Sequence, residues 1–171
     1  IPRFGQFGVI ASMQPQHEAS DRTMAEARLG PQRLTGAYAW KSIAATGAKL
    51  AFGSDTPVEP SEPFVGLAVA ISREGADGQP TGGWQPQEIL TREAALNAYT
   101  TGGAYAMFAE DRLGRIAKGY RADFLFVDVD PMTASPAQLR AARVSETWIG
   151  GQMAWSSAKD RVIPEKKVEE K

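Results

Sequence analysis

The chain has 171 residues, of which 43% are hydrophobic and 23% are charged, and its formal net charge is −1. This composition is typical of a globular protein, and the near balance of charges argues against a nucleic-acid interface, which needs a basic face. No apolar run approaches the ~20 residues of a membrane span. Because the chain has no cysteine, disulfides and cysteine-ligated metals are excluded. We therefore expect no nucleic-acid or membrane partner, and a cytoplasmic location.

The chain begins with a predicted helix and strand. Residues 1–7 are expected to form the last turns of a helix, which Gly8 ends. The continuous apolar run 9–13 favours a strand that is covered on both faces. Pro15 is expected to end this strand, because proline cannot donate to a strand ladder. A polar loop is predicted next, and its charged residues are Glu18, Asp21, Arg22 and Arg28.

The following two elements complete a βαβ unit. The helical spacing of apolar residues predicts a helix over 31–45, which begins at Pro31 and is stopped by Gly47. The apolar run 49–52 then predicts a second buried strand. Strand, helix and strand in this order form a parallel pair with a right-handed crossover, so the fold class is α/β.

Two helices and a long loop are predicted in the middle of the chain. The apolar stretch 64–72 favours a short helix, and the Gly- and Pro-rich stretch 74–86 favours a loop with one exposed aromatic residue, Trp84. Trp84 fits a lid contact and a loop anchor equally well. Thr91 is expected to cap a further helix that ends near Glu110.

The pattern changes to short β-like runs near residue 111. Strands are predicted at 122–127, 144–149 and 152–155, and one or two helical turns are predicted at 134–143. The pair Gly150-Gly151 between the last two strands is a strong hairpin signal. We therefore divide the chain into an α/β part at 1–110, a β part at 111–157 and a charged tail at 158–171.

Two chemically apt residues follow the two predicted parallel strands. His17 comes after the first strand and Asp55 after the second. Ligands and catalytic groups collect at this end of the strands in α/β sheets and barrels. Because neighbouring strands lie about 5 Å apart, the two side chains could share one pocket. The plainer alternatives are that Asp55 is a turn residue and that His17 is an ordinary loop histidine.

The chain offers few metal ligands of its own. A catalytic zinc normally takes three protein ligands and a water, whereas this chain has one histidine and no cysteine. Carboxylates alone could complete a site, and they suit harder metals better than zinc. The sequence has no Gly-rich phosphate loop after a strand, no nucleophile elbow and no His-Glu-x-x-His motif. Taken alone, these residues do not assemble a recognisable hydrolytic site.

A set of motifs in a fixed order resembles a known family. The motifs are Gly8-Val9-Ile10-Ala11-Ser12-Met13-Gln14-Pro15 with His17, Ala51-Phe52-Gly53-Ser54-Asp55-Thr56-Pro57, Leu90-Thr91-Arg92-Glu93-Ala94, Asp111-Arg112-Leu113-Gly114, Lys118-Gly119-Tyr120-Arg121-Ala122-Asp123-Phe124 and Trp148-Ile149-Gly150-Gly151. Together they are similar to the C-terminal portion of the metal-dependent amidohydrolases, specifically the amidohydrolase-3 group with its YtcJ-like proteins and N-substituted formamide deformylases.

The resemblance implies a fold and two site residues. Such enzymes have a (β/α)8 TIM barrel and a small β-sandwich built from both chain ends, so this chain would be a C-terminal fragment with the last two βα units and part of the sandwich. Asp55 matches the family's strand-eight aspartate, which binds a divalent metal, expected to be zinc, and takes a proton from the metal's water. His17, in the Gln-Pro-x-His segment, would contact the substrate or the transition state.

The same resemblance implies that most of the site lies outside this chain. The family's strand-one His-x-His pair, its strand-four Lys or Glu and the histidines of strands five and six would all come before Ile1. We therefore expect the full-length protein to hydrolyse non-peptide C–N bonds in small amide substrates. This chain alone is expected to be inactive. Exposed barrel edges are expected to drive self-association. The competing hypothesis is a non-catalytic association module in which Asp55 is only a turn residue.

Overall fold

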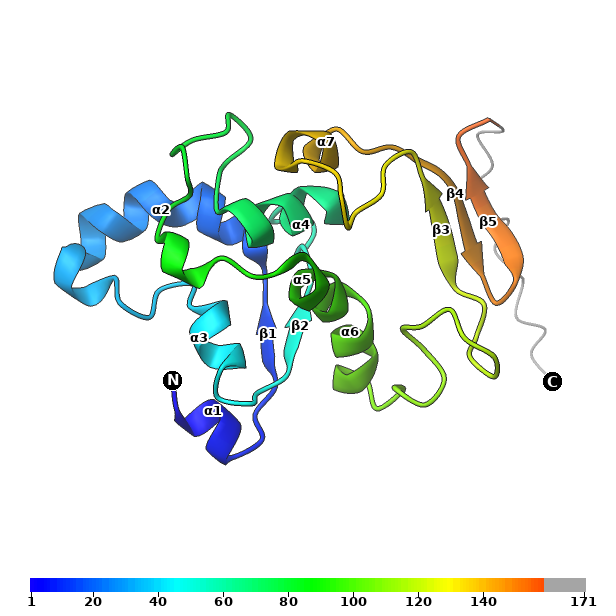
Figure 1. The fold of residues 1–171 in the computed structure, drawn as a ribbon, viewed down its shortest axis with the longest axis horizontal. Coiled ribbons are helices and arrows are strands. Elements are labelled where there is room, and N and C mark those ends of the chain that lie inside the picture. The colour runs from blue at the N-terminus through cyan, green and yellow to red at the C-terminus, as the bar shows by residue number, and fades with distance from the viewer. Residues whose placement is uncertain (159–171) are drawn as a thin grey trace.

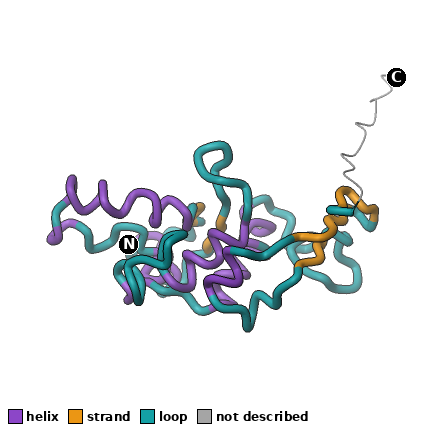
Figure 2. Tube along the Cα trace, turned by 90° about the horizontal axis from the view of Figure 1, so that it is seen from above, coloured by secondary structure: helices purple, strands orange, loops and turns teal. Residues whose placement is uncertain are grey.

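The computed structural model describes residues 1–158, and Figure 1 shows an elongated molecule with two parts. One part contains most of the helices around a two-stranded parallel sheet. The other part is a three-stranded antiparallel sheet at the opposite end, and the view in Figure 2 shows the same separation. Apart from residue 158, the predicted charged tail 158–171 lies outside the described residues. No helix within residues 1–158 is both long and apolar enough to cross a membrane.

The strands β1 (Ala11–Met13) and β2 (Leu50–Phe52) form the parallel pair that the sequence predicts. The short helix α1 (Arg3–Gln6) precedes β1, also as predicted. All three residues of β2 are buried, which fits a strand covered on both faces. In the register, Ala11 lies opposite Leu50 and Met13 lies opposite Phe52, so the two strands end at the same level.

Helix α2 (Pro15–Leu29) occupies the segment that the sequence predicts as a polar loop, and that prediction is wrong. Pro15 lies in the first helical turn, where the missing N–H costs no hydrogen bond, so it begins a helix as well as ending a strand. Gly30, with φ of 69°, follows the last residue of the helix. Charged residues of this segment, such as Glu18 and Arg22, are four residues apart, and this spacing places them on the same face of a helix.

The helix predicted over 31–45 is broken into two short pieces. The first piece is a 3-10 turn, η1 (Pro31–Arg33), and the second is α3 (Trp40–Ala44). Between them, the backbone takes positive φ at Gly36 (94°) and at Tyr38 (51°), which a continuous right-handed helix cannot contain. The connection from β1 to β2 therefore has α2 as its longest helix.

The helices after β2 agree with the prediction except at one break. Helix α4 (Pro63–Ser72) is apolar and largely buried, and the 3-10 turn η2 (Pro86–Glu88) follows the long loop. The expected single helix is divided into α5 (Arg92–Tyr99) and α6 (Thr101–Ala106), because Thr100 leaves the helical region with φ of −120° and ψ of −86°. The hydroxyl oxygen of Thr91 accepts a hydrogen bond from Ala94 N at 3.2 Å, which confirms the predicted cap.

The core lies between the parallel pair and the helices around it. The side chains of Trp40 and Leu139 are fully buried within it. The ring of Phe52 makes edge-to-face contacts with the rings of Trp40 and Tyr99, with centroids 6.0 and 5.5 Å apart. These contacts fix β2 between α3 and α5, so the end of β2 is set by the core.

The C-terminal sheet has the order β3–β4–β5 and contains β3 (Phe124–Val127), β4 (Val144–Ile149) and β5 (Gln152–Ser156). Positive φ at Gly150 (59°) and Gly151 (74°) forms the predicted hairpin turn between β4 and β5. Helix α7 (Pro136–Arg140), between β3 and β4, packs against α4 and not against this sheet.

Candidate functional site

The candidate site begins at the C-terminal ends of β1 and β2. The last residue pair of the ladder is Met13 with Phe52, and Gly53 N donates a further hydrogen bond to Met13 O at 3.2 Å. The segments that carry His17 and Asp55 therefore leave the sheet from the same edge. The predicted adjacency of the two strands is confirmed, and the site roles of the two residues stay predictions.

Two segments lie at this edge, and we call them the cap. One is α2, and the other is α4 with the loop 73–86 that follows it; Figure 1 shows them at the end of the parallel pair opposite to α1. Helices α2 and α4 pack against each other. Each of them begins after one of the two strands ends, so the cap is built on the edge where the candidate residues lie.

Asp55 lies in an exposed turn three residues after β2. Its backbone φ is 58°, a conformation that is uncommon for residues other than glycine and is more frequent for aspartate than for most. The turn is closed by a hydrogen bond from Val58 N to Asp55 O at 2.8 Å. The carboxylate accepts no hydrogen bond from the residues that the structure describes, so it is free to bind a ligand from solvent.

His17 lies in the first turn of α2, not in the loop that the sequence predicts. Its side chain is half-buried, and its Nε2 atom is buried without a hydrogen-bond partner among residues 1–158. A neutral imidazole has one donor and one acceptor nitrogen, and each needs a partner when it is out of water. This unpartnered nitrogen is consistent with a ligand contact at His17.

Glu18, the next residue, is fully buried, although its charge suggests a solvated position. Both of its carboxylate oxygens lack a hydrogen-bond partner within the described part of the chain. Burial raises the pKa of Glu18 to about 7, and the nearby charges of Arg73 and Arg22 oppose this shift. Glu18 therefore changes its charge near neutral pH, which an exposed glutamate does not do.

Arg73 is the second fully buried charge of the cap, and the sequence analysis does not identify it. Its guanidinium lies over the ring of Trp40, 4.4 Å from the centroid, and 5.6 Å from the centroid of Trp84. Its Nε donates to Trp84 O and its Nη1 donates to Tyr38 O at 3.0 Å. Burial lowers the pKa of Arg73, while the carboxylate of Glu18 opposes that shift. A single basic residue directly after the apolar run 64–72 is the only sequence signal for it.

The loop 73–86 is anchored near its two ends by contacts between Arg73 and Trp84. Trp84 is buried, with 7% of its surface exposed, so the expectation of an exposed aromatic is wrong and Trp84 is a loop anchor. Its Nε1 donates to Glu26 Oε1 of α2 at 2.7 Å, and Trp84 N donates to Arg73 O at 2.8 Å. Tyr38 similarly donates its hydroxyl to Asp21 Oδ2 of α2 at 2.7 Å. Polar residues of α2 thus bind the loop and Tyr38, although Glu26 stays exposed.

The described residues do not form a complete metal site. Residues 1–158 contain no group of three or more His, Cys, Asp or Glu side chains placed to bind one metal ion. Among these residues Asp55 is the predicted metal ligand, and its exposed carboxylate offers the oxygen atoms that divalent metals bind. A catalytic zinc normally takes three protein ligands, so further donors are required.

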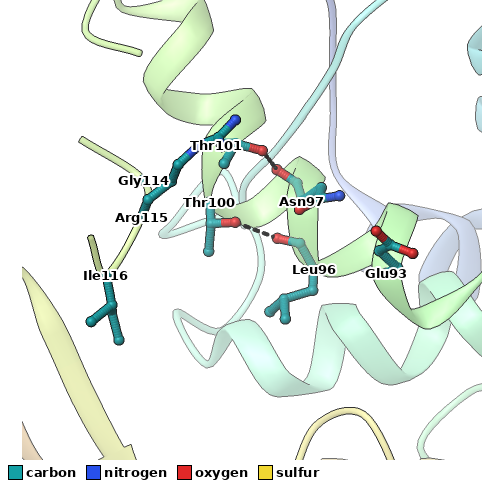
Figure 3. A pocket seen from close by; sticks show the side chains of 8 residues that line it. All are labelled: Glu93, Leu96, Asn97, Thr100, Thr101, Gly114, Arg115 and Ile116. Carbon is teal, nitrogen blue, oxygen red and sulfur yellow. Dashed lines mark hydrogen bonds between the residues drawn. The ribbon is translucent and has the colours of Figure 1, made fainter. Parts of the chain in front are cut away.

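A hollow of the described surface lies away from this edge. Its volume is about 590 Å³, and Figure 3 shows that it is formed by one side of α5 and α6 together with Gly114, Arg115 and Ile116. The hydroxyls of Thr100 and Thr101 point back to the carbonyls of Leu96 and Asn97, at 2.8 and 3.2 Å. Because these polar groups are already paired and Asp55 does not line this hollow, we do not assign the catalytic site to it.

Two curated relatives are similar over most of this chain. The amidohydrolase YtcJ of Bacillus subtilis (strain 168) is 34% identical over 158 residues, which are 92% of this chain and 30% of YtcJ. The N-substituted formamide deformylase of Arthrobacter pascens is 30% identical over 115 residues, which are 67% of this chain and 21% of that protein. The chain therefore spans less than a third of the length of the curated relatives it matches.

Solved structures of metal-dependent hydrolases are similar in fold. An uncharacterized metal-dependent hydrolase from Pyrococcus furiosus matches with a TM-score of 0.64 and 34% identity, over 77% of this chain and 26% of that chain. An adenosine deaminase from Xanthomonas campestris with bound zinc matches with a TM-score of 0.60 and 22% identity, over 90% of this chain and 33% of that chain. The second match supports the fold alone.

The family comparison covers nearly the whole described region. The model of the amidohydrolase family matches residues 1–154, and this range includes β1, β2, the cap and most of the C-terminal sheet. Together with the relatives above, it shows that the chain belongs to the amidohydrolase family.

Proposed function

We propose that this chain is the C-terminal part of an enzyme that hydrolyses non-peptide C–N bonds with the help of a divalent metal. The observation that carries this proposal is the register of β1 and β2, which sends the segments of Asp55 and His17 out from one edge in a chain of the amidohydrolase family. The name of one relative, N-substituted formamide deformylase, supports a small amide-type substrate. In this proposal, β1 and β2 are the last two strands of a barrel.

Asp55 is the proposed metal ligand and general base. A divalent metal, with zinc as our choice, would lower the pKa of a coordinated water towards about 7. The exposed carboxylate of Asp55 accepts the proton of the attacking water as its oxygen adds to the substrate carbonyl. Asp55 then donates that proton to the leaving nitrogen while the C–N bond breaks, so the amine departs neutral.

His17 is the proposed substrate contact. The Nε2 atom of its ring is buried without a partner in the described part of the chain, and the first turn of α2 holds it at the same edge as Asp55. An N–H at this position can donate to the carbonyl oxygen of the substrate as negative charge develops there. This contact is stronger in the transition state than in the ground state, so it raises the rate.

The remaining ligands are proposed to come from sequence that precedes this chain in a longer protein. One proposed ligand, Asp55, is fewer than a catalytic zinc needs, and the relatives are more than three times as long as the matched region. We therefore expect the 171-residue chain alone to be inactive. We also propose that the apolar surfaces of the C-terminal sheet pair with that preceding sequence, or with a second copy when it is absent.

The test is a screen of formamides, N-acyl amines and cyclic amides with the full-length protein and its Asp55→Asn variant. We expect Asp55→Asn to lower kcat by at least about 100-fold with unchanged thermal unfolding, because the general base is lost. The matched control is Asp111→Asn, since Asp111 is also an exposed aspartate but lies beyond α6. If Asp55→Asn and Asp111→Asn turn over substrate equally, Asp55 is not the base.

The turn at Asp55 favours one alternative, a non-catalytic association module. The hydrogen bond from Val58 N to Asp55 O and the positive φ give Asp55 a structural role that needs no metal. The codons that precede Ile1 distinguish the two functions. A His-x-His motif after a strand there supports the enzyme, and a start codon directly before Ile1 supports the module.

A further inference from the structure

The loop between Gly53 and Glu62 is held at both ends by one short segment. At its beginning, Gly53 N donates to Met13 O at 3.2 Å. At its end, Gln16 Nε2 donates to Glu62 O at 3.2 Å. Met13 and Gln16 are three residues apart at the junction of β1 and α2. The loop that carries Asp55 is therefore closed onto the segment that leads directly to His17.

Inside the loop, the contacts are local and exposed. Val58 N donates to Asp55 O at 2.8 Å, and the hydroxyl of Thr56 donates to Glu59 O at 3.1 Å. Both bonds join residues within the loop, so they shape its turn but do not fix the turn relative to the rest of the site. Among the side-chain hydrogen bonds found within residues 1–158, the one from Gln16 joins the end of this loop to α2.

The surroundings of Gln16 make it an anchor with little freedom. Only 4% of its surface is exposed, and its Cγ atom packs against Gly66 of α4. A Cβ atom on Gly66 would collide with the hydroxyl group of Tyr99, so glycine is required for this close approach of α4. Gln16 thus extends from α2 towards the first turn of α4, where the hydroxyl of Tyr99 also lies.

Stability alone does not account for an amide at this position. The Oε1 atom of Gln16 is buried without a hydrogen-bond partner in the described part of the chain. A buried polar atom without a partner lowers stability, and an apolar side chain of the same length avoids this penalty. Local departures from the most stable choice are expected at functional sites.

We propose that Gln16 is a positioning residue that fixes the Asp55 loop relative to the first turn of α2, and so sets Asp55 against His17. This inference rests on the proposed function for its catalytic consequence, while the mechanical link itself does not. Gln16→Met keeps the length and burial of the side chain and removes the donor to Glu62 O. The variant therefore removes the side-chain link between α2 and this end of the loop without leaving a cavity, while the backbone bond from Val65 N to Glu62 O remains.

The first measurement is amide hydrogen exchange of the segment 53–62 in the protein and in Gln16→Met. We expect exchange in this segment to become at least about fivefold faster, because the loop opens locally without global unfolding. The melting temperature should be unchanged or higher, since the unpartnered Oε1 is removed. Gln87→Met is the matched control, because Gln87 is an exposed glutamine on η2. Unchanged exchange in Gln16→Met, or a fall in melting temperature with uniformly faster exchange, would overturn the proposal.

The second measurement is turnover by the full-length protein. We expect Gln16→Met to lower kcat about tenfold or more with a smaller change in KM, because a displaced base is felt mainly in the chemical step. Equal kcat values for Gln16→Met and Gln87→Met, with Asp55→Asn inactive, would overturn the positioning role and leave the proposed function intact. Faster exchange in Gln16→Met with full activity in Asp55→Asn would instead refute the proposed function and retain the link.

Discussion

The cap and the C-terminal sheet depart from the usual burial of side chains in opposite ways. In the cap, two charged residues, Glu18 and Arg73, are fully buried. In the sheet, large apolar residues are exposed: Phe126 at 53% and Met153 at 43% on one face, and Leu125 at 40% and Trp155 at 37% on the other. The cap is thus packed within this chain, whereas the sheet presents apolar surface on both faces.

The difference indicates which part of this chain depends on a partner. A three-stranded sheet is stable when one of its faces packs against another element, and α7 packs on α4 and not on this sheet. The edge-to-face and stacked contacts among Phe124, Phe126 and Trp148 hold the sheet together from one face only. We therefore expect mutations in the cap to change the stability of this chain, and mutations in the sheet to change its association.

The largest effect is expected for Arg73→Met in the cap. The substitution removes the donors to Trp84 O and Tyr38 O and leaves Glu18 without its buried cation. Hydrogen bonds from a charged group contribute about 1.5–3 kcal/mol each, so we expect a loss of about 3 kcal/mol or more of unfolding free energy, measured by urea denaturation. Arg112→Met is the control, because Arg112 is exposed and should change stability by less than about 0.5 kcal/mol. Equal midpoints for the two variants would show that the buried cation does not stabilise the cap.

A similar loss is expected where the sheet segment is tied to the cap. Leu139 of α7 is fully buried against α4, between β3 and β4 in the chain. Leu139→Ala should lower the unfolding free energy by about 3 kcal/mol, through lost burial and a cavity. A change below 1 kcal/mol in urea denaturation would mean that the two parts are not joined at α7.

The stability of the cap should also depend on pH. The folded-state pKa of Glu18 is raised from 4.5 to about 7, so the folded protein holds this proton more tightly than the unfolded chain. The contribution is fully present below pH 4.5 and is lost as pH rises through 7, by up to about 3 kcal/mol. Glu18→Gln should remove this dependence, so urea midpoints of wild type and variant should diverge between pH 5 and pH 8, with the variant more stable at pH 8. Parallel midpoints across that range would contradict a buried proton at Glu18.

The smallest effect on stability is expected in the sheet. Phe126→Ser should lower the unfolding free energy by only about 1–1.5 kcal/mol, because about half of the side chain is already exposed and the loss is mainly its edge-to-face contact with Phe124. Its effect should appear in light scattering of the 171-residue chain, as a lower average mass. If the chain is a monomer before the substitution, the exposed faces do not drive self-association.

The sequence predicts the parts of the fold that follow from short-range patterns. The apolar runs at β1 and β2, the cap residue Thr91 and the Gly150-Gly151 hairpin all carry local signals that the structure confirms. The placement of His17 and Asp55 after adjacent strands follows from the βαβ order, because parallel strands end at one edge.

Helix α2 of the cap escapes prediction because its polar residues resemble a solvated face. Glu18, Arg22 and Glu26 are spaced four residues apart, a pattern that equally fits an exposed helix with intrahelical ion pairs. Their partners, Arg73 and Trp84, are about 60 residues away in the chain, and no local pattern indicates such contacts. Pro15 adds to the error, since a proline after a strand ends one element and begins another.

The most direct test of the proposed metal role of Asp55 is the metal content of the purified full-length protein, measured by elemental analysis for wild type, Asp55→Ala and Asp111→Ala. We expect wild type and Asp111→Ala to retain the same amount of divalent metal per chain. Asp55→Ala should retain clearly less, and a folded far-UV circular dichroism spectrum should show that the loss is not caused by unfolding. Equal metal content and equal amide turnover in all three proteins would contradict the assignment of Asp55 as a ligand at the end of β2.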